Sequence, residues 1–126
     1  YIIGGLRYTM NDIEHGILRG NRKRPGSFKK QFSKSNQRRR YVIRTFDPRI
    51  HFALVCGAKS CPPIRVFKAD NVERALQWAT ESFVQEETTV DIAKATVTCS
   101  SLFLWYKFDF GKTNDNILAF LHKYMK

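Results

Sequence analysis

The stretch that decides the fold is residues 70–83, DNVERALQWATESF. Asp70, followed three residues later by Glu73, is a capping arrangement typical of the start of a helix. Apolar residues then recur at the spacing of one helical face: Val72, Ala75, Leu76, Ala79 and Phe83. An amphipathic helix of this kind must bury its apolar face against other elements. The stretch therefore predicts a helix over residues 70–85 that packs on a core.

The residues before this helix favour both strands and helices. Residues 1–8 are expected to form a short strand, and Thr9 with Asp12 provides a capping signal for a helix. The buried face of that helix would carry Ile13, Ile17 and Leu18. Residues 41–43 and 50–55 are expected to be strands, and the second is apolar on both faces, as in a covered central strand.

The residues after the helix of 70–85 predict both strands and helices. β-Branched residues over 88–92 and 95–99 predict a hairpin. Ser101 is expected to cap a short helix that carries Leu102, Phe103, Trp105 and Tyr106, and Asn114 or Asp115 to start the last helix. The inward residues of that last helix would be Ile117, Leu118, Leu121 and Tyr124. The fold class is therefore α+β, a small mixed sheet with packed helices.

Length and composition favour one domain over residues 1–126. The chain has 126 residues, 43% of them hydrophobic, which is enough for one core. No stretch approaches the roughly 20 apolar residues of a transmembrane helix, and residues 1–5 do not resemble a signal peptide. Three cysteines cannot form a disulfide framework, so we expect a reducing, cytoplasmic location.

The positive charge is concentrated in residues 19–44, the cationic segment. It holds eleven of the 22 Lys and Arg residues and no Asp or Glu. Its Gly, Pro, Ser and Asn residues indicate a basic surface insertion, which either remains solvated or contacts a polyanion such as RNA or an acidic lipid. Phe28, Phe32 and Tyr41 are available to stack on bases or to enter headgroups. The candidate polyanion-binding residues are Arg22, Lys23, Arg24, Arg38, Arg39 and Arg40.

A second candidate site lies in residues 47–63, DPRIHFALVCGAKSCPP. An apolar strand that enters a Gly-bearing loop is a common place for a ligand, and the candidate ligand-binding residues are Asp47, Arg49, Lys59 and Ser60. Cys61 lies near Lys59, whose charge favours the nucleophilic thiolate. His51, or His15 of the first helix, is the candidate base, and Glu14 or Asp47 is available to orient the imidazole.

Structural and metal interpretations of the same residues remain open. A buried histidine usually bonds a backbone carbonyl, and free cysteine is often a core residue, as we expect for Cys99. Cys56 and Cys61 with His51 and His15 offer a zinc ligand set, although the spacing is not a common zinc pattern. The two cysteines are also close enough in sequence for a redox-sensitive disulfide. We expect no metal and no cofactor.

Three segments together resemble a known family: residues 10–19, MNDIEHGILR, residues 47–63, and residues 105–110, WYKFDF. In this order and spacing they look like the domain of unknown function 547 family. The resemblance implies a module that starts further upstream, so we expect this chain to be its C-terminal part. It also implies a multidomain protein in which glutaredoxin-like or DEP domains accompany the module. A fainter resemblance is to papain-like and transglutaminase-like cysteine enzymes, in which a histidine heads a strand as His51 would.

Three functions follow as hypotheses. The first is a binding or interaction module of a larger cytoplasmic protein, with a protein or anionic partner. The second is a thiol-dependent hydrolase or acyltransferase that uses Cys61 with His51 or His15. The third is polyanion binding through the cationic segment, which predicts a steep loss of affinity with salt.

Overall fold

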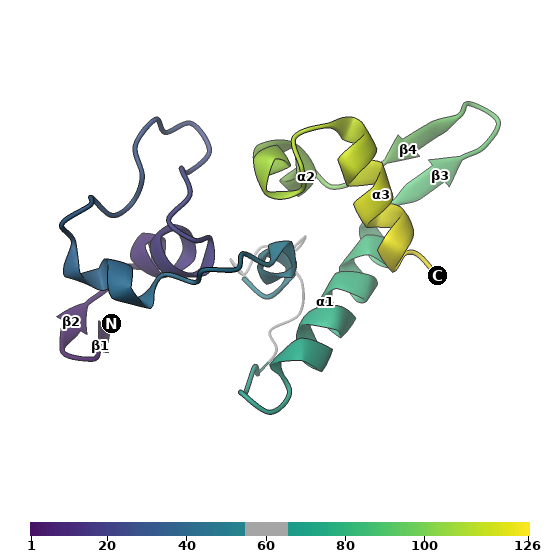
Figure 1. Ribbon diagram of the computed structural model, residues 1–126. Coiled ribbons are helices and arrows are strands. Elements are labelled where there is room, and N and C mark those ends of the chain that lie inside the picture. The colour runs from purple at the N-terminus through teal and green to yellow at the C-terminus, as the bar shows by residue number, and fades with distance from the viewer. Residues whose placement is uncertain (55–65) are drawn as a thin grey trace. The chain divides into compact units, whose positions relative to one another are not determined.

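The helix expected over residues 70–85 is confirmed as α1, Val72–Glu87 (Figure 1). Its fully buried face is formed by Leu76, Ala79, Thr80, Phe83 and Val84. The expected capping pair is wrong: Asn71 precedes the helix, and the Glu73 carboxylate instead bonds the Arg49 guanidinium at 2.8 Å. Val72 is 40% exposed, so the buried face is turned slightly from the predicted one.

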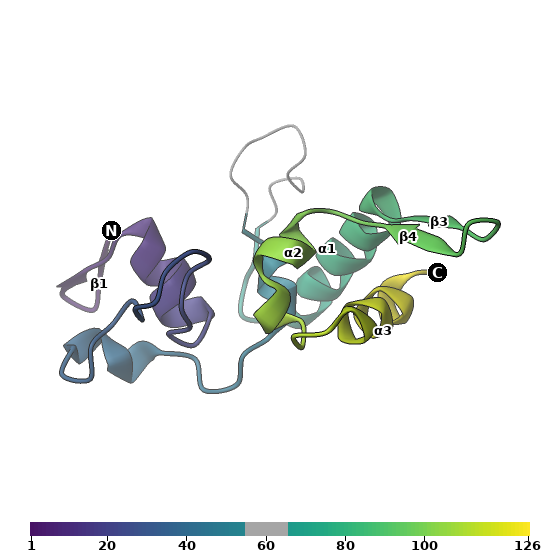
Figure 2. The same ribbon diagram turned by 90° about the horizontal axis from the view of Figure 1, so that it is seen from above.

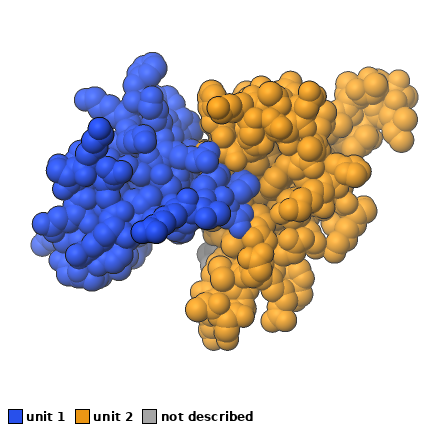
Figure 3. All heavy atoms as spheres, in the orientation of Figure 1, with its two compact units in different colours: residues 1–48 blue, residues 49–126 orange. Residues whose placement is uncertain are grey.

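This computed structural model describes residues 1–54 and 66–126. The chain forms two compact units, Tyr1–Pro48 and Arg49–Lys126 (Figure 3). The α+β class is confirmed, because helices occur with antiparallel strands. Within the described ranges the strands pair as two separate two-stranded hairpins, where one small mixed sheet was expected.

The first unit opens with a tight hairpin in place of the single strand predicted for residues 1–8. Strand β1, Ile2–Ile3, pairs with β2, Leu6–Arg7. The turn residues Gly4 and Gly5 have φ of +56° and +78°, the left-handed region that a two-residue hairpin turn requires and that glycine adopts without steric cost.

The first helix begins with the predicted cap. The Thr9 amide donates to the Asp12 carboxylate at 2.9 Å, and the Asp12 amide donates to the Thr9 hydroxyl at 3.1 Å. The following element η1, Asp12–Leu18, is a π-helix, and the wide turn ends with the Arg19 amide bonded to the Glu14 carbonyl at 2.8 Å. Its fully buried residues are Asp12, His15 and Gly16, whereas the predicted apolar residues are only half-buried.

The cationic segment is anchored to η1 at its centre. The ring of Phe32 is 2% exposed and packs so closely on Gly16 that a Cβ there would lie 2.4 Å from the ring carbons. The Asn21 side chain donates to the Phe32 carbonyl at 3.0 Å and accepts from the Phe32 amide at 2.8 Å. The expected surface insertion therefore includes a buried anchor, which its charge and breaker residues did not indicate.

Both strands predicted in the middle of the chain are wrong. Tyr41 ends the 3₁₀ helix η2, Gln37–Tyr41, and the Ile43 amide bonds the Ile17 carbonyl rather than a strand. Residues Pro48–Phe52 form the 3₁₀ helix η3, after which the Ala53 and Leu54 amides bond the Ile50 carbonyl. An apolar run reports burial, and a short run does not distinguish a buried strand from a buried turn.

The second unit packs three helices around an aromatic core. Helices α1 and α3, Asn114–Tyr124, lie side by side, and α2, Leu102–Trp105, precedes the 3₁₀ turn η4, Lys107–Asp109 (Figures 1 and 2). The predicted hairpin is confirmed as β3, Thr89–Asp91, and β4, Thr96–Thr98. The buried core consists of Phe52, Ala79, Phe83, Val84, Phe103, Phe110, Leu121 and Tyr124.

One detail of the predicted C-terminal helices needs correction. Leu118 is 45% exposed and does not face inward, whereas Leu121 and Tyr124 are buried as expected. Helix α3 begins at Asn114, as predicted, and is capped by Thr113, whose hydroxyl accepts from the Asn116 amide at 3.1 Å.

Candidate functional site

A buried histidine–aspartate pair lies in the second unit. His51 comes from η3 and Asp109 from η4, and their Nε2 and Oδ2 atoms are 2.9 Å apart. The two side chains are only 2% and 1% exposed. Since a carboxylate only accepts hydrogen bonds, Nε2 of the imidazole is the donor. The pair fixes the tautomer of His51 and leaves the proton-accepting role of the neutral ring to Nδ1.

Aromatic rings enclose the imidazole of His51. The ring of Tyr106 lies 4.2 Å away and that of Phe110 lies 5.5 Å away, measured between centroids. The turn of η4, in which the Asp109 amide bonds the Tyr106 carbonyl at 2.8 Å, carries these side chains to the same place. A carboxylate that orients an enclosed imidazole is the arrangement that hydrolases and acyltransferases use beside a nucleophile.

The other residues predicted for this site are distributed as follows. Arg49 pairs with Glu73, and Asp47 is a half-buried residue of the first unit. Cys56, Lys59, Ser60 and Cys61 lie outside the described residues, so the predicted thiol nucleophile and the predicted disulfide and zinc alternatives remain predictions.

The carboxylate that orients His51 is one that the sequence reasoning did not name. Glu14 or Asp47 was expected to orient the imidazole of His51 or His15, and for His51 the contacting carboxylate is that of Asp109. The available signal was an acid inside the apolar run WYKFDF of residues 105–110, because a carboxylate among aromatic residues is buried only with a partner.

The second predicted histidine, His15, lies in the first unit. Its Nδ1 is 2.8 Å from Nη1 of Arg19 and 3.8 Å from the Glu14 carboxylate. A guanidinium only donates, so Nδ1 of His15 is an acceptor here. The buried His15 thus receives a hydrogen bond within η1, and Arg19 also donates to the Lys23 carbonyl at 3.2 Å. These contacts hold the start of the cationic segment against the helix.

Most cations of the cationic segment are exposed. The first unit contains twelve Lys and Arg against three Asp and Glu, a formal charge of +9. The exposed cations of the segment are Arg22, Lys23, Arg24, Lys29, Lys30, Lys34, Arg39, Arg40 and Arg44. Of the six predicted polyanion-binding residues, Arg38 alone is only half-exposed, since it bonds the Asp12 carboxylate at 2.7 Å.

Asp12 is the acidic centre of the first unit. Burial raises its pKa, but hydrogen bonds from Thr9 and Gln31 and the charge of Arg38 outweigh that effect and lower the pKa below its usual range. The Gln31 amide and the Arg38 guanidinium both donate to this carboxylate at 2.7 Å. Asp12 therefore stays ionised and joins η1 to two points of the cationic segment.

The remaining predicted features concern cysteine, metal and membrane. Cys99 is a half-buried free thiol that packs against the core, as expected, and burial raises its pKa. Among residues 1–54 and 66–126, no group of three or more His, Cys, Asp or Glu side chains is arranged to hold a metal ion. None of the helices in these two ranges has the length and apolar character that crossing a membrane requires.

Comparison with protein families supports the resemblance seen in the sequence. The family described as "Protein of unknown function, DUF547" matches residues 1–84, two thirds of the chain. The chain belongs to the DUF547 family. The matched part includes His51 and the whole cationic segment, whereas Asp109 lies beyond it. No curated protein and no solved structure matches this DUF547 chain.

Proposed function

We propose that this DUF547 chain is a binding module that holds an anionic partner through the cationic segment. The observation that carries the proposal is the formal charge of +9 on the first unit, most of it on exposed side chains. A surface of this charge attracts phosphate-rich partners by releasing their counterions. The resemblance implies that the module acts within a larger protein, beside glutaredoxin-like or DEP domains, and the three cysteines favour a cytoplasmic one.

Exposed aromatic side chains support this function. Phe28 is 92% exposed and follows the turn at Pro25 and Gly26, and Tyr41 is 42% exposed. The guanidinium of Arg40 lies 4.8 Å above the Tyr41 ring. Exposed rings among cations favour unpaired bases or lipid headgroups, since both present a flat or apolar face beside a phosphate.

The test compares two double charge reversals. Binding of a 20-nucleotide oligouridine is measured by fluorescence anisotropy, and binding of phosphatidylserine vesicles by sedimentation, at 50 and 200 mM salt. Arg39→Glu with Arg40→Glu is expected to weaken binding at least tenfold and to reduce the salt slope by about one for each lost phosphate contact. The matched control, Lys68→Glu with Lys112→Glu, changes exposed lysines of the second unit. Equal affinity of the two variants, or affinity independent of salt, contradicts the proposal.

A second candidate function rests on the His51–Asp109 pair. The buried carboxylate holds the imidazole in one tautomer, which supports a thiol-dependent hydrolase or acyltransferase with Cys61 as nucleophile. In that reaction the thiolate attacks an acyl carbon, and the imidazole holds the thiol proton until it is transferred to the leaving group.

Alkylation kinetics test this second function. Iodoacetamide labelling of each cysteine is followed from pH 5 to 9 by mass spectrometry, with Asp109→Asn and Cys61→Ser as variants. Fast labelling of Cys61 at pH 6, slowed at least tenfold by Asp109→Asn, supports an activated thiolate. Cys99 is the internal control, because its raised pKa keeps it slow. A Cys61 rate that Asp109→Asn leaves unchanged contradicts the function.

A further inference from the structure

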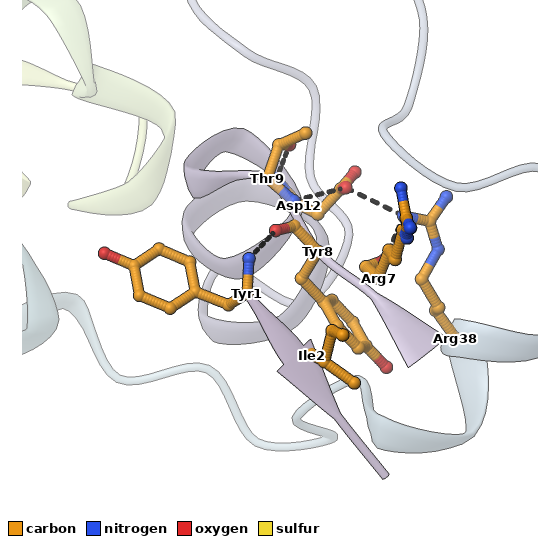
Figure 4. Close-up of a pocket in the computed structure, with 7 residues that line it drawn as sticks. All are labelled: Tyr1, Ile2, Arg7, Tyr8, Thr9, Asp12 and Arg38. Carbon is orange, nitrogen blue, oxygen red and sulfur yellow. Dashed lines mark hydrogen bonds and ion pairs between the residues drawn. The ribbon is translucent and has the colours of Figure 1, made fainter. Parts of the chain in front are cut away.

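The first unit contains a pocket of about 440 Å³ beside the hairpin and the start of η1 (Figure 4). Its polar lining includes Arg7, Asp12 and Arg38, and its apolar walls are formed by Tyr1, Ile2 and Tyr8. The volume falls in the range of small-molecule sites.

The donors of this pocket are not all used. Arg38 donates through Nε to Asn36 and through Nη1 to Asp12 and to the Arg7 carbonyl. The Arg38 guanidinium lies over the Tyr8 and Phe32 rings, and its Nη2 has no hydrogen-bond acceptor among the described residues. The guanidinium of Arg7 has no acceptor among these residues either. Both groups only donate, so an anion is the ligand that accepts from them most strongly.

The acidic residue of the pocket is already satisfied. Asp12 accepts from Thr9, Gln31 and Arg38, and its charge is balanced by Arg38 at 2.7 Å. Arg7 therefore adds an uncompensated positive charge to the lining. A cationic ligand would meet Arg7 without a free carboxylate, whereas an anionic ligand would meet the Arg7 guanidinium and Nη2 of Arg38.

We propose that this pocket binds a small organic anion, with its phosphate or carboxylate group between Arg7 and Arg38 and its apolar body against Tyr1, Ile2 and Tyr8. The site is separate from the exposed cations proposed to hold a polyanion. Its ligand is distinguished by the apolar body, because the walls of the pocket offer more to a ring or chain than to a phosphodiester backbone.

Calorimetric titration with phenyl phosphate tests the proposal on the 126-residue protein. Wild type is expected to bind phenyl phosphate in a saturable manner, at least tenfold more tightly than inorganic phosphate or phenol. Inorganic phosphate lacks the apolar ring, and phenol lacks the anionic group. Benzylamine, which carries the opposite charge on a similar body, is expected not to bind. Saturable binding of benzylamine alone, or of no probe at millimolar concentration, overturns the proposal.

Two variants test whether phenyl phosphate binds in the pocket. Arg7→Gln is expected to weaken phenyl phosphate binding by about tenfold or more, the effect of losing a charge-assisted hydrogen bond. Arg44→Gln removes the same charge from an exposed side chain of the same unit that does not line the pocket. Equal weakening by the two variants overturns the proposal and indicates general charge attraction. The reversal of Arg39 and Arg40 leaves the pocket lining intact, so loss of polyanion binding and loss of phenyl phosphate binding are separable results.

Discussion

Replacing Gly16 by alanine is expected to destabilise the first unit, although alanine normally stabilises a helix. Helix propensity alone favours Ala over Gly by about 1 kcal/mol. Against this, the new Cβ would lie 2.4 Å from Cε2 and Cζ of Phe32. Phe32 is 2% exposed and its backbone is held by Asn21, so the ring has little room to move. Overpacking a core costs about 1–3 kcal/mol, and losing a buried Phe side chain costs about 3–5 kcal/mol.

The expected net loss is therefore roughly 0–2 kcal/mol if the ring tilts and about 2–4 kcal/mol if it leaves the core. Hydrogen exchange of the Arg19 amide, which bonds the Glu14 carbonyl, reports the opening free energy of η1. Amides of α1 in the second unit serve as the internal control. Their protection should not change, because the perturbed contact lies within the first unit.

A double-mutant cycle separates the contact from propensity. In a Phe32→Ala background the space beside residue 16 is open, so Gly16→Ala should now stabilise η1 by up to about 1 kcal/mol. The same substitution should thus change sign between the two backgrounds. If Gly16→Ala stabilises η1 in the presence of Phe32, the close packing of the anchor is refuted.

Four further predictions concern single side chains. Asp109→Ala should destabilise the second unit by about 3–5 kcal/mol in urea unfolding and Asp109→Asn by less, because Asn retains an acceptor for His51; the reverse order contradicts a hydrogen-bonded pair. Tyr8→Phe removes a buried hydroxyl that has no partner among the described residues. The opening free energy of η1, measured by hydrogen exchange, should therefore be unchanged or higher by up to about 1 kcal/mol. The pKa of Asp12 is lowered on folding, so the ionised carboxylate stabilises the first unit above the ordinary pKa of 3.8, and this stabilisation is lost as pH falls through the folded pKa. An NMR titration of Asp12 should give a pKa below 3.8. Asp12→Asn should abolish this part of the pH dependence of stability. The pKa of Cys99 is raised by burial, so its alkylation at pH 8 should be slower than that of free cysteine, and rapid labelling at pH 7 would contradict this.

The periodic and capped elements were those that the sequence could predict. Helix α1, the β3–β4 hairpin and the Thr9–Asp12 cap each depend on residues within a short window, and each is present. The strand predicted over residues 50–55 is wrong for the described residues 50–54, because the signal there was hydrophobicity without a period. Local hydrogen bonds to the Ile50 carbonyl closed a turn where the pattern suggested a strand.

The contacts that build the candidate sites were beyond such reasoning, because they join distant parts of the chain. His51 and Asp109 are 58 residues apart, and Asp12 meets Arg38 across 26 residues. Composition identified the cationic segment as one block of charge. It gave no indication that Arg38 and Phe32 would be fixed against η1 while Arg39 and Arg40 remain exposed.

The bonds between Asn21 and Phe32 close a short loop, and closure has a consequence for the kinetics of partner capture. The two residues are 11 positions apart, and Arg22, Lys23, Arg24, Lys29 and Lys30 lie between them. Joining the two ends of the loop restricts the distances between these five charges, and the loss of chain entropy occurs when the unit folds. Once one phosphate of a chain-like anion reaches the loop, its neighbours encounter the other cations at a high effective concentration. Cutting the tie with Asn21→Ala should therefore speed dissociation of such a partner while leaving the net charge unchanged.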